Sequence, residues 1–278
     1  MKPPIRLLAV DIDGTLLDPQ FQVSAANLAA LRRAHQAGVE IVLGTGRRHA
    51  FAMPVAEALG FDVWLISSNG AVTKSSRGEL FHRDLLPAPV ARKLILYMSG
   101  FRPNAVLTFD VEGHGALVVE SCDTLNGVIQ RWMEKNAQYL QAVVPLENAL
   151  TVDPIQIMYC GPIARMQEAE AHLAAADFIS DITLLKTQYD ARNLCILDVL
   201  NKDCSKGHAL KRWAEHRGLT RDQVMAIGDN YNDLEMLEFA GMPFLMGNAS
   251  ADLKANGFRV TLPNDQSGVA AALQEVGI

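Results

Sequence analysis

The chain has 278 residues, of which 49% are hydrophobic and 20% are charged, and its formal net charge is −6 at pH 7. This length suits one large domain or two smaller ones, and such a chain needs no disulfide or metal staple. The negative charge and the lack of a basic block argue against a nucleic-acid or anionic-membrane surface. No run of 18 apolar residues is present, so we predict no membrane span.

The cysteines do not form a recognisable pattern. They are Cys122, Cys160, Cys195 and Cys204, and none belongs to a Cys-x-x-Cys pair. We therefore expect reduced thiols and neither a zinc site nor a disulfide framework. Because the start of the chain also lacks a signal-peptide pattern, the expected location is the cytoplasm.

The first part of the chain alternates strands and helices. The expected strands cover residues 6–10, 39–43 and 63–66. Ser24 is a typical N-cap for a helix over residues 25–37, and a second helix ends near Leu59. A hairpin with arms at residues 71–73 and 80–82 follows.

The last part alternates in the same way. Its expected helices cover residues 206–217, 234–240 and 267–276. Its expected strands cover residues 224–227, 243–246 and 258–261. Strand–helix alternation at these spacings predicts an α/β fold with a doubly wound parallel sheet.

The middle of the chain mixes hairpins with helices. Residues 105–110 and 116–120 flank a glycine-containing turn and predict a hairpin. The other expected elements are a helix from Pro87 to Met98, a helix over 164–176, and strands at 155–159, 182–185 and 194–199. This mixture predicts an α+β insert, placed at residues 84–192, with 1–83 and 193–278 forming the core. Such an insert can act as a lid that selects the substrate.

Two carboxylates follow the first expected strand. The segment reads Leu7-Leu8-Ala9-Val10-Asp11-Ile12-Asp13-Gly14-Thr15. Ligands of an open α/β sheet gather outside the carboxyl ends of its strands. There one carboxylate can attack an electrophile and the other can move a proton, and Mg²⁺ would offset their repulsion. By itself, Asp-x-Asp is also common in surface turns.

Three further loops are expected near Asp11. Gly44-Thr45-Gly46-Arg47 can cradle phosphate oxygens with its hydroxyl and backbone N–H groups. Lys206 would lie in the first turn of a helix, where its positive charge is unfavourable because it opposes the helix dipole. A phosphate and carboxylates nearby would offset this cost.

The third loop is Gly228-Asp229-Asn230-Tyr231-Asn232-Asp233. In it Asp229 can complete a cation site with Asp11, and Asn232 can cap a helix and bind phosphate. Separately these patterns also fit a glycine turn, a surface lysine and a helix cap. Together they favour phosphoryl chemistry.

These motifs resemble those of the haloacid dehalogenase superfamily, and within it the Cof-like phosphatases with a C2-type (IIB) α+β cap. The matching segments, in chain order, are Asp11-Ile12-Asp13-Gly14-Thr15, Thr45-Gly46-Arg47, Ser67-Ser68-Asn69-Gly70-Ala71, Ser205-Lys206-Gly207 and Gly228-Asp229-x-x-Asn232-Asp233. They span the whole chain. The resemblance implies a Rossmann-like core with an inserted cap.

The resemblance also implies roles for individual residues. Asp11 would attack a phosphomonoester and form an aspartyl-phosphate, while Asp13 would move the protons. Mg²⁺ would be held by Asp11, the backbone carbonyl of Asp13 and Asp229. The groups implied to bind the phosphoryl oxygens are Thr45, Gly46, Lys206, Asn232 and the backbone N–H of Ile12. Arg47 would reach the substrate or steady the insert, and Asn69 would lie near the substrate or form a structural turn.

The expected function is therefore Mg²⁺-dependent hydrolysis of small phosphorylated metabolites, such as sugar phosphates. A phosphomutase acting on sugar phosphates is the alternative, because the motifs around Asp11 do not separate the two. A mutase would conserve ester phosphate. A phospho-accepting receiver module also uses an Asp, a Lys and Mg²⁺, but it is much shorter and lacks a proton shuttle equivalent to Asp13.

Overall fold

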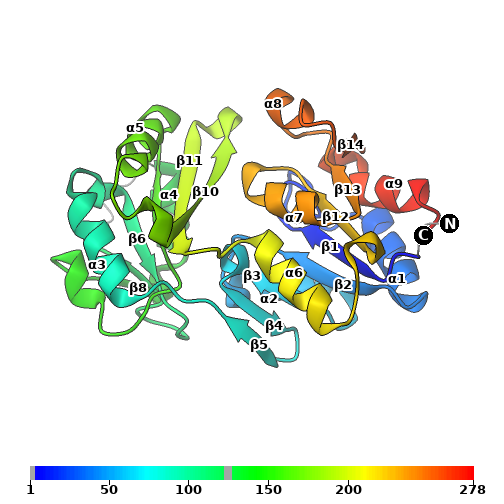
Figure 1. Cartoon of the computed structure of the whole chain (residues 1–278), viewed down its shortest axis with the longest axis horizontal. Helices are drawn as coiled ribbons and strands as arrows, with labels where there is room; N and C mark the ends of the chain where they lie inside the picture. Colours follow the sequence, from blue (N-terminus) through cyan, green and yellow to red (C-terminus); the bar gives the residue numbers. More distant parts are fainter. Residues whose placement is uncertain (1–3, 122–126) are drawn as a thin grey trace. The chain divides into compact units, whose positions relative to one another are not determined.

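The computed structural model describes residues 4–121 and 127–278, which form two compact units (Figure 1). Unit 1 contains the residues up to Arg83 together with Ser205–Ile278, and unit 2 contains Asp84–Cys204. The insert was expected to end at residue 192. It ends instead after Cys204, because strand β11 (Leu194–Asn201) pairs with two strands of unit 2.

Unit 1 is built on an eight-stranded sheet with the order β14-β13-β12-β1-β2-β3-β4-β5. Its strands are β1 (Leu7–Asp11), β2 (Glu40–Gly44), β3 (Trp64–Ser67), β4 (Val72–Ser75), β5 (Leu80–Arg83), β12 (Val224–Gly228), β13 (Met242–Leu245) and β14 (Arg259–Val260). All neighbours are parallel except in the hairpin region, where β4 is antiparallel to β3 and β5. This confirms the predicted α/β class.

Helices pack on both faces of this sheet. They are α1 (Ala25–Gln36), α2 (His49–Leu59), α6 (Lys206–His216), α7 (Leu234–Phe239), α8 (Ala251–Lys254) and α9 (Gly268–Glu275). In β1, Leu8 and Val10 belong to the core cluster on the α1 and α2 side, while Leu7 and Ala9 belong to the cluster with α6. Burial on both faces explains why β1 is continuously apolar, and it holds the end of the strand firmly.

Unit 2 has a six-stranded sheet with the order β10-β11-β9-β6-β7-β8. Its other strands are β6 (Ala105–Thr108), β7 (Leu117–Val119), β8 (Leu140–Ala142), β9 (Gln156–Gly161) and β10 (Ile182–Tyr189). Among the described strand pairs of this six-stranded sheet, β7 and β8 are parallel and the others are antiparallel. The helices α3 (Ala88–Tyr97) and α5 (Ile163–Ala174) bury their apolar faces in a core of its own, and α4 covers Gly127–Lys135. The unit is thus α+β, as predicted.

Two expectations about the whole chain concern its thiols and membrane spans. Cys160, Cys195 and Cys204 are buried and form no disulfide among the described residues, whereas Cys122 lies outside them. Burial raises the pKa of the Cys195 thiol to about 11, so this thiol stays protonated at neutral pH. Among the described residues, no helix is long and apolar enough to cross a membrane.

Candidate active site

The carboxyl end of β1 carries a buried charge cluster in unit 1. Lys206, at the start of α6, donates from Nζ to Oδ1 of Asp11 and to Oδ1 of Asp233, both at 2.7 Å. The side chains of Lys206 and Asp233 are 1% and 0% exposed. Buried charges persist only when they are paired, so this ammonium ties the first strand to the loop after β12.

Asp229 lies beside this pair and is oriented by two neutral donors. The hydroxyl of Thr15 donates to its Oδ1 at 3.1 Å, and the side-chain amide of Asn248 donates to its Oδ2 at 3.3 Å. Gly14 approaches so closely that a Cβ there would overlap the Asp229 carboxylate, and its φ of +87° also favours glycine.

Three carboxylates of the cluster could hold a metal ion. Oxygens of Asp11, Asp229 and Asp233 lie within 4.8 Å of one another. Both oxygens of Asp233 already accept hydrogen bonds, Oδ1 from Lys206 and Oδ2 from two backbone N–H groups. Oδ2 of Asp11 is buried and has no hydrogen-bond partner among the described residues. Asp11 and Asp229 therefore fit a hard cation best, because carboxylate oxygens are the ligands that Mg²⁺ prefers.

The electrostatics of the cluster point the same way. Burial, followed by the charge of Asp233, raises the pKa of Asp11 to about 7 despite the opposing Lys206. Burial and the charge of Asp11 also raise the pKa of Asp229 well above its usual range. Burial alone would lower the pKa of Lys206, but the two carboxylates outweigh it and hold that pKa above the usual value. A bound cation would relieve the repulsion between the acids.

Asp13 lies outside the three-carboxylate group. Its carboxylate receives two hydrogen bonds from Arg47, at 2.7 Å from Nε and 2.5 Å from Nη2. The backbone N–H of Arg47 in turn donates to the hydroxyl of Thr45 at 3.0 Å. The expected phosphate loop is thus joined to the expected proton shuttle, and only the backbone carbonyl of Asp13 remains as its possible metal ligand.

Of the remaining predicted residues, Asn232 and Asn69 contact each other, while Gly46 and Ile12 can offer only backbone groups. Asn232 donates from Nδ2 to Oδ1 of Asn69 at 2.9 Å, and both residues are buried. The same Asn69 amide lies 3.2 Å from the position that a Cβ on Gly46 would occupy. The side chain of Ile12 is fully buried in the core, so its backbone is what it can offer to a ligand.

Sequence comparison identifies the family that carries this geometry. Residues 8–273 match the haloacid dehalogenase-like hydrolases. The chain belongs to this family. One relative is phosphatase YwpJ of Bacillus subtilis, which is 31% identical over 98% of this chain and 100% of that protein. An HMP-PP phosphatase of Escherichia coli is 34% identical over 90% of this chain and 87% of that protein.

A solved structure agrees with the assignment. A haloacid dehalogenase-like hydrolase from Bacillus subtilis aligns with a TM-score of 0.80 and 28% identity, over 98% of this chain and 100% of that one. The family resemblance drawn from the motifs is therefore confirmed, and the hydrolase is a phosphatase.

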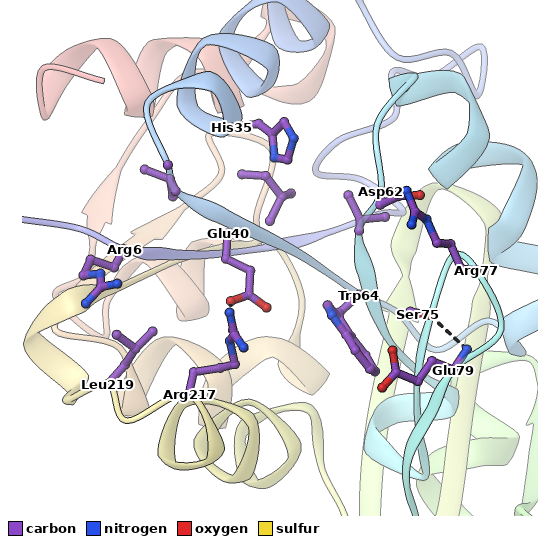
Figure 2. A pocket seen from close by; sticks show the side chains of 14 residues that line it. Arg6, His35, Glu40, Asp62, Trp64, Ser75, Arg77, Glu79, Arg217 and Leu219 are labelled. Carbon is purple, nitrogen blue, oxygen red and sulfur yellow. Dashed lines mark hydrogen bonds and ion pairs between the residues drawn. The ribbon is translucent and has the colours of Figure 1, made fainter.

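A cavity of about 420 Å³ lies elsewhere in unit 1 of the hydrolase (Figure 2). It is lined by Glu40 and Trp64, which begin β2 and β3, so it lies at the sheet edge opposite Asp11. Its charged side chains pair with one another, as in the 2.8 Å contact from Arg217 Nε to Glu40 Oε2.

Three residues that contact the charge cluster were not predicted from the sequence to do so. Asp233 was quoted only as part of a motif and given no role at the site, yet it pairs with Lys206. Thr15 and Asn248 were given no role, yet both contact Asp229. The signal for Asn248 was its position just after an expected strand near residues 243–246, at the same sheet edge as Asp11.

Gly14→Ala tests the close approach to Asp229. We expect it to lower the free energy of unfolding more than Gly38→Ala does, measured by thermal unfolding. Gly38 has a similar φ of +86° but no atom within 4 Å of its Cβ position. Both variants incur roughly 1 kcal/mol of backbone strain, and overlap at Gly14 adds about 1–3 kcal/mol. Equal losses would contradict the close approach.

Proposed function

We propose that this phosphatase is a Mg²⁺-dependent phosphomonoester hydrolase that acts on small phosphorylated metabolites through an aspartyl-phosphate at Asp11. The observation that carries this proposal is the state of the Asp11 carboxylate. One oxygen is held by Lys206, and the other is buried and has no hydrogen-bond partner in the part of the chain that the structure describes. An oxygen of the same carboxylate lies within 4.8 Å of one of Asp229. A fixed carboxylate with one free oxygen suits nucleophilic attack on phosphorus.

The reaction divides between the two aspartates. An oxygen of Asp11 forms a bond to phosphorus as the ester P–O bond breaks, and Asp13 gives a proton to the departing alcohol. Asp13 then takes a proton from the water that attacks the phospho-enzyme, which releases phosphate and restores Asp11. Both oxygens of Asp13 bond to Arg47, and each keeps a second lone pair on which a proton can be carried.

The phosphoryl oxygens are bound by groups at the same sheet edge. Lys206 supplies a buried positive charge, and phosphoryl transfer depends mainly on such positioning and neutralisation. The other donors in this proposal are Thr45, Gly46, Asn232 and the backbone N–H of Ile12. Arg47 and Asn69 border this set through their contacts with Asp13 and Asn232. The substrate then comes within reach of both aspartates.

Asp11, Asp229 and the backbone carbonyl of Asp13 are the residues proposed to hold Mg²⁺. When bound, the ion supplies positive charge that offsets the charge developing on the phosphoryl group. Thr15 and Asn248 keep the Asp229 carboxylate oriented for this task. The oxygen-only donor set supports a hard cation.

Phosphate release from a panel of phosphorylated metabolites tests the function. The panel contains sugar phosphates, pyridoxal phosphate, flavin mononucleotide and HMP-PP, the compound in the name of the Escherichia coli relative. We expect release with Mg²⁺ and a fall of at least about 100-fold in excess EDTA, restored by added Mg²⁺. Undiminished release in EDTA would remove Mg²⁺ from the proposal. Conversion of a sugar phosphate to its isomer without phosphate release would favour a mutase.

A further inference from the structure

Asn248 joins loops that surround the acidic cluster. It follows β13, and its Nδ2 donates to the carbonyl of Gly14 at 2.8 Å as well as to Oδ2 of Asp229 at 3.3 Å. Its Oδ1 accepts a hydrogen bond from the backbone N–H of Asn264 at 2.9 Å. An exposed side chain thus has both of its polar atoms in use, on three separate loops.

The two oxygens of Asp229 accept hydrogen bonds from residues that are far apart along the chain. Thr15, just after β1, donates to Oδ1, and Asn248, just after β13, donates to Oδ2. One bond on each oxygen fixes the plane of the carboxylate. Each oxygen of an ionised carboxylate can accept a second interaction, so both keep a lone pair for a cation. Both donors are neutral and leave the negative charge of Asp229 in place.

We propose that Asn248 is a positioning residue for Asp229, which it holds in the orientation that binds a divalent cation together with Asp11. This inference rests on the proposed function, which takes that cation to be Mg²⁺. Asn248 also binds the Gly14 carbonyl, so it fixes the loop carrying Asp13 and Gly14 against Asp229 with a single amide. Partners that orient a metal ligand typically change metal affinity 10–100-fold when they are removed.

Positioning and simple stabilisation predict different results. Asn248 is exposed, and exposed hydrogen bonds contribute little to the free energy of unfolding. If Asn248 were instead mainly structural, its removal would lower the thermal midpoint of the metal-free protein. A positioning role would leave that midpoint nearly unchanged and weaken cation binding.

The test is calorimetric titration of the full-length, metal-free protein with Mg²⁺ alone. We expect Asn248→Ala and Asn248→Leu, which keeps the branching of the side chain without its polar atoms, to raise the Mg²⁺ dissociation constant about 10–100-fold. Asn256→Ala is the matched control, because Asn256 is an exposed asparagine of the same stretch of chain. It should bind Mg²⁺ as the unmutated protein does, and Asp229→Asn should abolish binding.

Each outcome has one meaning. Unchanged Mg²⁺ affinity in both Asn248 variants, with binding lost in Asp229→Asn, would overturn the role of Asn248 and leave the proposed function standing. A large fall in the metal-free thermal midpoint with unchanged affinity would also overturn it. Absence of Mg²⁺ binding to the unmutated protein would overturn the Mg²⁺ dependence of the proposed function, and this inference with it.

Discussion

Asp11→Asn is expected to abolish phosphate release, with a loss of at least about 1,000-fold in kcat. An amide is nearly the same shape as a carboxylate, but it cannot form the acyl phosphate that the proposed reaction requires. Phosphate release from the best substrate of the panel measures the effect. Asp265→Asn, an exposed aspartate distant in sequence from the cluster, is the control and should retain full activity.

The Asp11→Asn variant should also differ from the unmutated protein in how its thermal midpoint depends on pH. Burial raises the pKa of Asp11 to about 7, so the folded state binds this proton more tightly than the unfolded chain does. The stabilisation from that proton is present at low pH and is lost as the pH rises through 7. The neutral amide avoids this loss, so at pH 8 in EDTA we expect a thermal midpoint equal to or above that of the unmutated protein. An inactive variant with a much lower midpoint would instead indicate misfolding, and near-normal turnover would refute the nucleophile.

Lys206→Met is expected to reduce both stability and activity. Lys206 neutralises Asp11 and Asp233, and its removal leaves two carboxylates buried without their cation. Breaking a buried ion pair costs roughly 3–5 kcal/mol. That corresponds to a fall of roughly 6 °C or more in the thermal midpoint of a unit of this size. Turnover should fall at least about 100-fold, because a preorganised charge on the phosphoryl group is lost.

The pH dependence of this loss identifies its cause. Without Lys206, protonation of Asp11 or Asp229, whose pKa values burial raises, neutralises part of the cluster in metal-free protein. The deficit should therefore be largest above pH 7 and smaller at pH 5, because Lys206 lowers the pKa of Asp11 to about 7 and its removal raises that pKa further, so that only the unmutated protein has a stabilised Asp11 carboxylate above pH 7. Lys211→Met, on an exposed position of the same helix, is the control. Equal midpoints for the two lysine variants at pH 8 would contradict the buried pairing.

Local sequence patterns predicted the elements of the sheet well because burial leaves direct marks on a sequence. The apolar run before Asp11 is buried on both faces, and Ser24 caps α1 by accepting a hydrogen bond from the backbone N–H of Asn27. The three-residue strand β8 and the four-residue helix α8 (Ala251–Lys254) were not predicted. Elements this short carry too few residues to show a period.

The boundary of the insert shows a limit of such patterns. Residues 194–199 were correctly expected to form a strand, but a strand's sequence does not say which sheet it joins. The hydrogen-bonded register of β11 with β9 and β10 decided that it belongs to unit 2. Pairing across distant segments depends on packing of the whole unit, which no local window contains.

By itself the sequence determined the α/β class, the family and the residues that gather where β1, β2 and β12 end. It could do so because parallel strands bring their carboxyl ends to one edge, so residues that follow strands become neighbours. Only the tertiary structure decided how these residues pair. It placed Lys206 between Asp11 and Asp233, turned Asp13 toward Arg47, and brought Thr15 and Asn248 onto the two oxygens of Asp229. Those contacts depend on the distances and orientations of side chains in the folded protein, which no local stretch of the sequence specifies.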